Sequence, residues 1–225
     1  MKKHSIFNCF IYIFFAALPI CSHAEADLDL FFKSVAFDDV STVSQLLNQG
    51  ADPNAIDKTG NTALLLALNE GSFQVAKLLI ESPKIDLEKP NLTKETPLMM
   101  AAFKGSFDLV KLLVDAHGVE INHPGWTALH YASTNGHTRI VEYLLDKGAY
   151  VDPESPNKTT ALMMAARGGH IHIVKFLLDH KADLSLVNGA GMTAIEFAEQ
   201  SNQKEIVEGL KSRWKKIYGK PYPNK

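Results

Sequence analysis

Residues 127–152 read TALHYASTNGHTRIVEYLLDKGAYVD, and this stretch decides the fold. Thr127 is suited to begin a helix, because its hydroxyl can accept a hydrogen bond from a free backbone N–H of the first turn. Gly136 is suited to end that helix. A second helix is predicted after it, since apolar residues at positions 140, 141, 144 and 145 form one stripe. The stretch therefore predicts a pair of short helices joined by a glycine.

The same pattern recurs along most of the chain. Copies begin at Thr62, Thr96, Thr127, Thr160 and Thr193, with spacings of 34, 31, 33 and 33 residues. Each continues into a second apolar stretch, such as VAKLLI, LVKLLV or IVKFLL, and a weaker first copy starts at residue 29. An alanine recurs at one site of the five strong copies, where a small side chain lets two helices approach closely. A period near 33 residues is typical of a repeat array rather than of one globular core.

These copies resemble ankyrin repeats, whose signature T-P-L-H-x-A is matched by TPLMMA at residue 96 and TALHYA at residue 127. The resemblance covers residues 27–211 and implies an all-α solenoid of six helix-turn-helix repeats, two of them caps, with short hairpin connectors. The expected repeats span residues 27–59, 60–93, 94–124, 125–157, 158–190 and 191–218, followed by a disordered C-terminal tail, 219–225.

The connector DAHGVEINHPGW, before Thr127, is shorter than the others. It predicts a truncated hairpin, so that one finger should differ in shape from its neighbours. At the end of the chain, KSRWKKIYGKPYPNK interleaves basic and aromatic residues. A contact with a membrane surface or a partner and a last helix with a frayed end are both compatible with this stretch.

The first 24 residues have the features of a secretory signal peptide. A basic start, an apolar run and small residues at 22 and 24 predict cleavage after Ala24. A retained anchor and a lipoprotein attached at Cys21 are the alternatives, and bulky Ile20 argues against the lipoprotein. We expect export to the bacterial periplasm, as in small secreted ankyrin-repeat proteins. Cleavage removes Cys9 and Cys21, so the mature chain would be held by packing alone.

The histidines invite a test for a metal site. His130 and His137 occupy positions that other copies fill with Leu65, Met99 or Ser72, so structural roles are expected. In ankyrin repeats the first hydrogen-bonds near the repeat's threonine and the second acts at the helix turn. A metal site needs three or four converging ligands, and His170 with His172 does not supply them. No metal and no cofactor are predicted.

The sequence contains no motif of a familiar enzyme. There is no Gly-rich phosphate loop after a strand, no Gly-x-Ser-x-Gly and no His-Glu-x-x-His. A formal charge of −2 does not suggest a nucleic-acid binder. We therefore predict a monomeric, non-enzymatic protein that binds neither nucleic acid nor, after signal cleavage, a membrane.

The resemblance implies a protein partner, bound by the hairpin tips and the inner, concave helix face. Aromatic and Arg residues are enriched at interface hot spots. Packing between helices is the alternative role for Phe103 and Tyr131, and Met99, Met100, Met163 and Met164 are expected to fill gaps between repeats. The predicted partner-binding residues are Phe103, Lys104, His123, Trp126, Tyr131, Asn135 and Arg167.

The expected function is thus that of a protein–protein interaction scaffold. Similar periplasmic proteins imply two finer roles. One is support of oxidative-stress defence, and the alternative is an immunity protein that neutralises a toxin.

Overall fold

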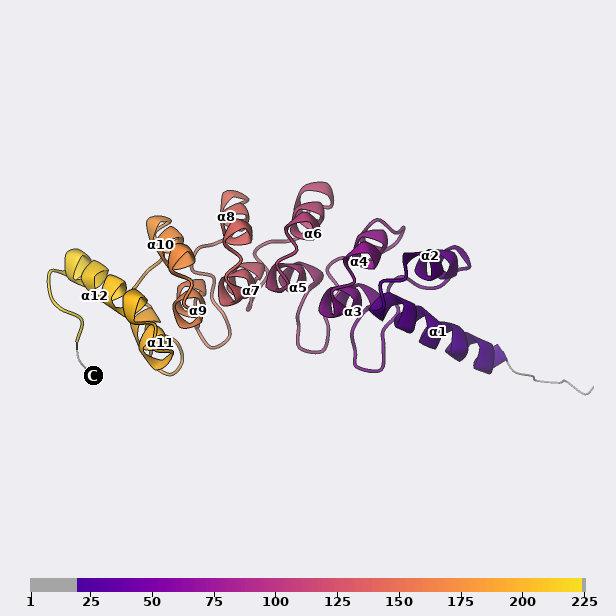
Figure 1. The fold of residues 1–225 in the computed structure, drawn as a ribbon, viewed down its shortest axis with the longest axis horizontal. Helices are drawn as coiled ribbons and strands as arrows, with labels where there is room; N and C mark the ends of the chain where they lie inside the picture. The colour runs from indigo at the N-terminus through magenta and orange to yellow at the C-terminus, as the bar shows by residue number, and fades with distance from the viewer. Residues whose placement is uncertain (1–19, 224–225) are drawn as a thin grey trace, which may run out of the picture.

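The computed structural model describes the backbone of residues 20–223 and the side chains from Asp27 onward. Over this part of the chain, helices alternate between two rows that run side by side along a curved solenoid (Figure 1). The inner helices lie on the concave side, the outer helices lie on the convex side, and long loops extend beneath the inner row (Figure 1). The predicted all-α repeat solenoid is confirmed.

Each repeat contributes one inner and one outer helix. The inner helices are α1 (Ile20–Ala36), α3 (Ala63–Glu70), α5 (Pro97–Phe103), α7 (Ala128–Asn135), α9 (Ala161–Gly168) and α11 (Ala194–Gln200). The outer helices are α2 (Val40–Asn48), α4 (Phe73–Ile80), α6 (Phe107–Lys111), α8 (Thr138–Asp146), α10 (Ile171–Asp179) and α12 (Lys204–Tyr218). Helix α6 continues as a π-helical turn, η1 (Leu112–Ala116).

Threonines begin the inner helices as the sequence predicts. The Thr62 hydroxyl accepts a hydrogen bond from the backbone N–H of Leu65 at 3.2 Å, and Thr160 does the same for Met163 at 3.3 Å. Such a cap satisfies one of the free N–H groups of the first turn. In the fourth repeat the Thr127 hydroxyl instead bonds the ring of His130.

Small side chains hold the two rows together. The recurring alanines at positions 67, 101, 132, 165 and 198 are fully buried, and Ser34 fills the same site in the first repeat. Around them, leucines, isoleucines and valines from both rows form one continuous core. No repeat encloses this core alone, so neighbouring repeats depend on one another.

Glycine at the end of an inner helix makes room for the next repeat. A side chain on Gly105, which has φ of +74°, would collide with the ring of His137, whose Cε1 lies 2.4 Å from the ideal Cβ position. The His137 ring lies over this glycine, and its Nε2 donates to the carbonyl of Phe103 at 2.9 Å. His170 lies over Gly136 in the same way and bonds the carbonyl of Thr134. These histidines join consecutive repeats, as their repeat positions indicate.

The loops between repeats form fingers joined by a ladder of hydrogen bonds. The side chains of Asn54, Glu88, Asn122 and Asp152 each accept a bond from a backbone N–H of the following finger, at 2.7 to 2.9 Å. This ladder fixes where each finger begins.

The third finger is truncated, as predicted. Seven residues, 55–61, separate Asn54 of the ladder from Thr62, whereas only residues 123–126 separate Asn122 from Thr127. We call the resulting gap, at residues 123–126 between the tips of the second and fourth fingers, the notch. The loop before α7 is correspondingly short in Figure 1.

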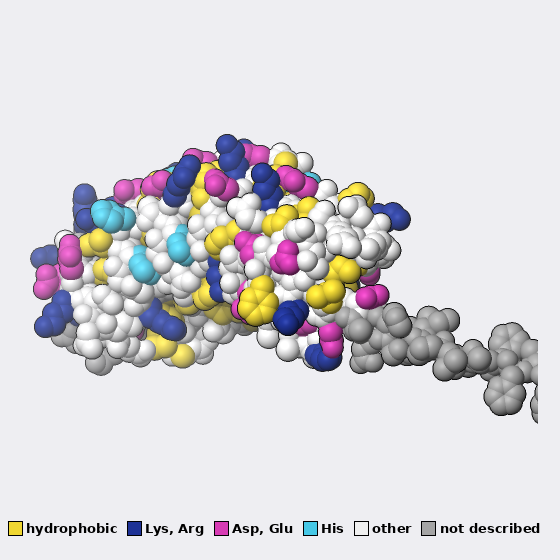
Figure 2. Space-filling model, turned by 45° about the vertical axis from the view of Figure 1, so that its right-hand side comes forward, with side chains coloured by type: hydrophobic (Ala, Val, Ile, Leu, Met, Phe, Trp, Pro, Cys, Tyr) yellow, Lys and Arg dark blue, Asp and Glu magenta, His cyan; other side chains and the backbone are white. Residues whose placement is uncertain are grey.

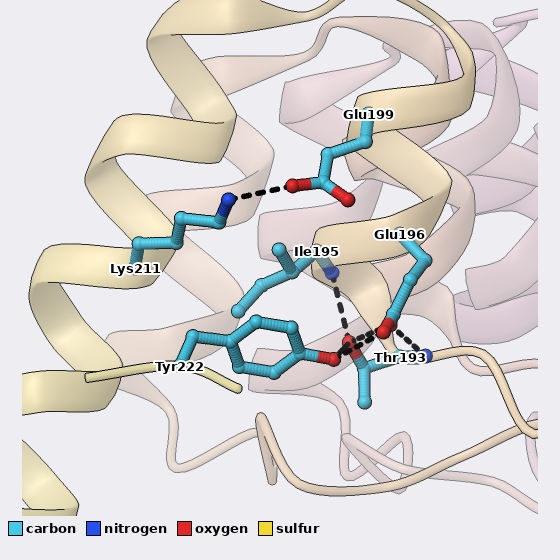
Figure 3. Close-up of polar contacts among 6 residues, drawn as sticks. All are labelled: Thr193, Ile195, Glu196, Glu199, Lys211 and Tyr222. Atoms are coloured by element: carbon cyan, nitrogen blue, oxygen red, sulfur yellow. Dashed lines mark hydrogen bonds and ion pairs between the residues drawn. The ribbon is translucent and has the colours of Figure 1, made fainter. Parts of the chain in front are cut away.

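The C-terminal end corrects one expectation. A disordered tail from residue 219 was predicted, but after Gly219 the chain turns back and Tyr222 docks on α11 (Figure 3). Its hydroxyl donates to Glu196 at 2.5 Å and lies 3.0 Å from the Thr193 hydroxyl, while its ring meets Trp214 edge to face. Burial, followed by the Glu196 carboxylate, raises the pKa of Tyr222 to about 12. Tyr222 thereby bonds Glu196, which holds on α11 the position that His130 holds on α7.

The predicted signal peptide falls mostly on residues 1–19, which lie outside the described residues. In the part of the chain that is described, none of the helices has both the length and the apolar character that crossing a bilayer requires.

Candidate protein-binding surface

An aromatic hollow opens on the inner helices behind the notch. It has a volume of about 190 Å³ and draws its walls from three consecutive repeats. We call it the aromatic hollow; its lining residues are Phe103, Trp126, His130, Tyr131, Thr134 and Met164. Three of the predicted partner-binding residues therefore lie together.

The rings of the hollow hold one another in place. Phe103 and Tyr131 meet edge to face with centroids 5.9 Å apart, and Trp126 meets His130 in the same manner at 5.1 Å. Phe103, Trp126 and Tyr131 are each half-buried. They thus both pack between helices and present part of their surface, so the two roles considered for Phe103 and Tyr131 are not exclusive.

Glu95 fixes the hydroxyl end of Tyr131. The Tyr131 hydroxyl donates to the Glu95 carboxylate at 3.0 Å, across neighbouring repeats. Burial alone would raise the pKa of Glu95, but hydrogen bonds from Asn91, Thr93 and Tyr131 outweigh it and hold the pKa below its ordinary value. Burial, with Glu95 next, raises the pKa of Tyr131. Near neutral pH the pair is therefore a phenol donating to a carboxylate.

His130 forms the buried floor of the hollow. The Thr127 backbone N–H can only donate, so Nδ1 of His130 accepts this bond at 3.2 Å. Nε2 then carries the proton and donates to the carbonyl of Thr159 at 3.0 Å, in the next repeat. Burial lowers the pKa of His130 to about 4, so the ring is neutral at physiological pH. It is a structural link between repeats, as expected from the sequence.

The other four predicted residues do not line the hollow. Lys104 Nζ donates to the carbonyl of Asn69 at 2.7 Å, and Asn135 Nδ2 donates to the carbonyl of Phe103 at 2.8 Å. His123 is half-buried in the notch. Arg167 is exposed on α9, at the position that Phe103 holds on α5. The structure therefore places Phe103, Trp126 and Tyr131 in one hollow and the remaining four outside its lining.

Sequence reasoning missed part of the lining. Met164 was expected to fill a gap between repeats and His130 to be purely structural, yet both contribute surface to the hollow. Their repeat positions offered a signal, because Met164 and Tyr131 share one position on adjacent inner helices. Neighbours in such a stack face the same side.

Two other hollows of the described surface contain none of the predicted partner-binding residues. One, about 780 Å³, lies between the fourth and fifth fingers, and its lining combines charged residues such as Glu154 and Lys158 with apolar Leu186 and Val187. The other, about 220 Å³, lies between α10 and α12. Charged side chains of both signs are interspersed along the upper edge formed by the outer helices (Figure 2). Among the described side chains, no three His, Cys, Asp or Glu residues converge as a metal site would require.

Comparison with protein families identifies the repeat. A family model described as ankyrin repeats, in three copies, matches residues 30–124, 83–155 and 149–217. The matches together run through all six helix pairs of the solenoid.

One similar protein is alpha-latrocrustotoxin-Lt1a of the spider Latrodectus tredecimguttatus. It is 32% identical over 113 residues, which is 50% of this chain and 6% of that protein. The chain thus spans a small part of that relative, and the likeness concerns repeats rather than the whole toxin. Since the family model covers well over half of its residues, the chain belongs to the ankyrin repeat family.

Proposed function

We propose that this protein is a non-enzymatic scaffold that binds a protein partner through the aromatic hollow and the fingers beside the notch. The observation that carries the proposal is the hollow itself. Phe103, Trp126 and Tyr131 are pre-positioned by packing and by the Tyr131–Glu95 hydrogen bond, so binding orders few further side chains.

The chemistry of the hollow supports protein binding more than catalysis. Its one ionisable floor residue, His130, is buried and neutral with both ring nitrogens engaged. Glu95 already accepts three hydrogen bonds from its own neighbours. Half-buried aromatic rings at the centre of a concave face are instead typical of interface hot spots.

Export to the periplasm belongs to the proposal and rests on the sequence of residues 1–24, with cleavage after Ala24. We infer that the partner is a periplasmic protein. Support of oxidative-stress defence requires a partner present in the same strain under ordinary growth. Neutralisation of a toxin, in contrast, predicts that deletion of the gene is harmless until the toxin is supplied.

A pull-down from the periplasmic fraction tests the proposal. The tagged wild type is compared with the triple variant Trp126→Ala, Tyr131→Ala, Arg167→Ala. A control variant, Phe37→Ala, removes one exposed aromatic side chain of the first repeat, which lies outside the hollow and the fingers beside the notch. Circular dichroism establishes that each variant is folded.

We expect one protein to be retained by the wild type and by the control variant, and lost by the folded triple variant. Equal retention by all three would place the binding surface elsewhere. Retention of no protein by the wild type, with the toxin both present and absent, would contradict the scaffold function.

A further inference from the structure

The inner helices around the aromatic hollow carry an uneven charge. The inner helices of the third, fourth and fifth repeats, with their caps, contain no Asp or Glu; they span residues 96–105, 127–136 and 160–169. Their charged residues are Lys104 and Arg167. Both cations are exposed. The inner helices of the flanking repeats carry acids instead, at Glu70 on one side and Glu196 on the other. The centre of the concave face is therefore positive.

Two further cations stand at the tips of the second and fourth fingers, and the second of them, Lys158, also lines the hollow between the fourth and fifth fingers. Lys94 and Lys158 adopt left-handed backbone conformations, with φ of 64° and 59°, at the position where the third finger has Gly125. A residue with a Cβ pays about 1 kcal/mol or more to adopt this conformation. A strained position that holds an exposed cation on both sides of the notch is a reason to suspect a function for the charge.

These cations are not neutralised within the described part of the chain. The ion pairs found there use Lys58, Lys147, Lys211 and Arg213. Lys104 donates to a neutral carbonyl. No described carboxylate forms an ion pair with Lys94, Lys158 or Arg167. The acids at the finger bases, Glu88 and Asp152 among them, are engaged in the hydrogen-bond ladder.

One carboxylate, Glu95, lies close to the rings of the hollow and could favour a basic partner instead. However, Glu95 already accepts bonds from Asn91, Thr93 and Tyr131, whereas the four cations of these inner helices and fingertips pair with no carboxylate among the described residues. Charge complementarity steers association and excludes partners of the same sign. The balance of charge therefore favours an acidic partner.

We propose that the aromatic hollow receives one bulky apolar side chain from an acidic segment of the partner protein, whose carboxylates pair with Lys94, Lys104, Lys158 and Arg167. This inference rests on the proposed scaffold function and specifies the chemistry of the partner. Burial of this apolar side chain in the hollow removes its surface from water, and this contributes the favourable free energy that anchors the segment. The flanking carboxylates fix its orientation and speed its arrival.

Three short synthetic peptides test the inference. The first has a central Phe flanked by Glu residues, the second has Ala in place of that Phe, and the third has Lys in place of every Glu. Binding is followed by the fluorescence of Trp126 in a Trp214→Phe background, which leaves Trp126 as the one tryptophan of the chain. Trp214 is suited to this change, because its buried Nε1 has no hydrogen-bond partner among the described residues.

We expect a saturable fluorescence change with the acidic Phe peptide, and binding weaker by at least about tenfold for each of the other two. The affinity for the acidic Phe peptide should fall as salt is added, because exposed charge pairs are screened. The double variant Lys94→Gln, Lys158→Gln should bind it several-fold more weakly. The matched control is Lys84→Gln, Lys181→Gln, since these lysines also have positive φ but lie in the loops that follow α4 and α10. It should bind like the wild type.

Three results would overturn the inference. Tighter binding of the basic peptide would show that the hollow selects cations. Equal binding of the Ala peptide would show that no apolar anchor is needed. The absence of a saturable change with every peptide up to about 1 mM would remove the acidic segment as ligand. If the pull-down still separates wild type from the triple variant, the scaffold function stands and only this inference fails.

Discussion

At the residue scale, single side chains of the inner helices join neighbouring repeats. His130 bonds its own Thr127 and the carbonyl of Thr159, while His137 reaches back to the carbonyl of Phe103. The sequence predicted structural roles for both, because other copies replace them by Leu, Met or Ser at the same positions. It could not show which carbonyl each ring bonds, because that depends on how two repeats stack.

The depressed pKa of His130 predicts a dependence of stability on pH. An unfolded histidine titrates near 6.5 and the folded one at about 4. The unfolded chain therefore binds a proton first as the pH falls. The stabilisation is complete above pH 6.5 and is lost as the pH approaches 4, by up to about 3 kcal/mol.

His130→Met provides the comparison, because Met163 occupies the equivalent position of the next repeat. Urea unfolding at a series of pH values should give a free energy of unfolding that falls less steeply below pH 6.5 in the variant than in the wild type. Parallel curves for the two proteins would show that the titration of His130 does not contribute.

Tyr222 offers a second test at this scale. Tyr222→Phe keeps the ring against Trp214 but removes the hydrogen bond to Glu196. The free energy of unfolding should decrease by about 1 kcal/mol, because the half-buried carboxylate loses one donor. Tyr218→Phe is the control, since Tyr218 is an exposed tyrosine at the end of α12. Urea unfolding followed by circular dichroism measures both, and equal midpoints for the two variants would mean that the Tyr222 hydroxyl does not stabilise the cap.

At the element scale, repeat periodicity predicted the helices and connector length predicted the short third finger. In each inner helix, Thr marks the start, Ala marks the close contact with the neighbouring helix, and Gly marks the end. Each of these residue types is needed at its own position, so the sequence pattern can show it. The docked C-terminal segment was missed for a different reason. The Tyr222–Glu196 bond joins residues 26 positions apart, and no repeat position of Tyr222 indicates it, so only the fold shows this contact.

The strained fingertips predict opposite effects on stability and binding. Lys94→Gly should raise the free energy of unfolding by roughly 0.5 kcal/mol, because glycine adopts positive φ without the steric cost of a Cβ but loses more entropy on folding. The same change should weaken binding of the acidic Phe peptide. Lys84→Gly, at φ of 64° but away from the notch, should stabilise the protein similarly without changing the affinity.

Thermal melts and peptide titrations of these two variants measure both quantities. If Lys94→Gly stabilises the protein and still binds the peptide like the wild type, the charge at this fingertip has no part in binding.

At the scale of the whole molecule, the repeats act as one curved array. Each inner helix contacts its neighbours, so stability is a sum of repeat and interface contributions, and no single repeat encloses the core. The curvature turns one row of equivalent positions toward the same side, which is why Phe103, Thr134 and Arg167 follow one another along the concave face. These positions could be predicted from the sequence, but the depth of the hollow could not. It depends on the orientation of the Tyr131 ring, which bonds Glu95, and of the Trp126 ring, which packs against His130.

The most direct test of the central claim is amide hydrogen exchange of the protein with and without the partner retained in the pull-down. We expect slower exchange on binding in the loop 122–127 and in α5, α7 and α9, with little change in the outer helices α6, α8 and α10. Protection confined to the outer helices, with exchange around Trp126 and Tyr131 unchanged, would contradict the claim that this protein binds its partner through the aromatic hollow.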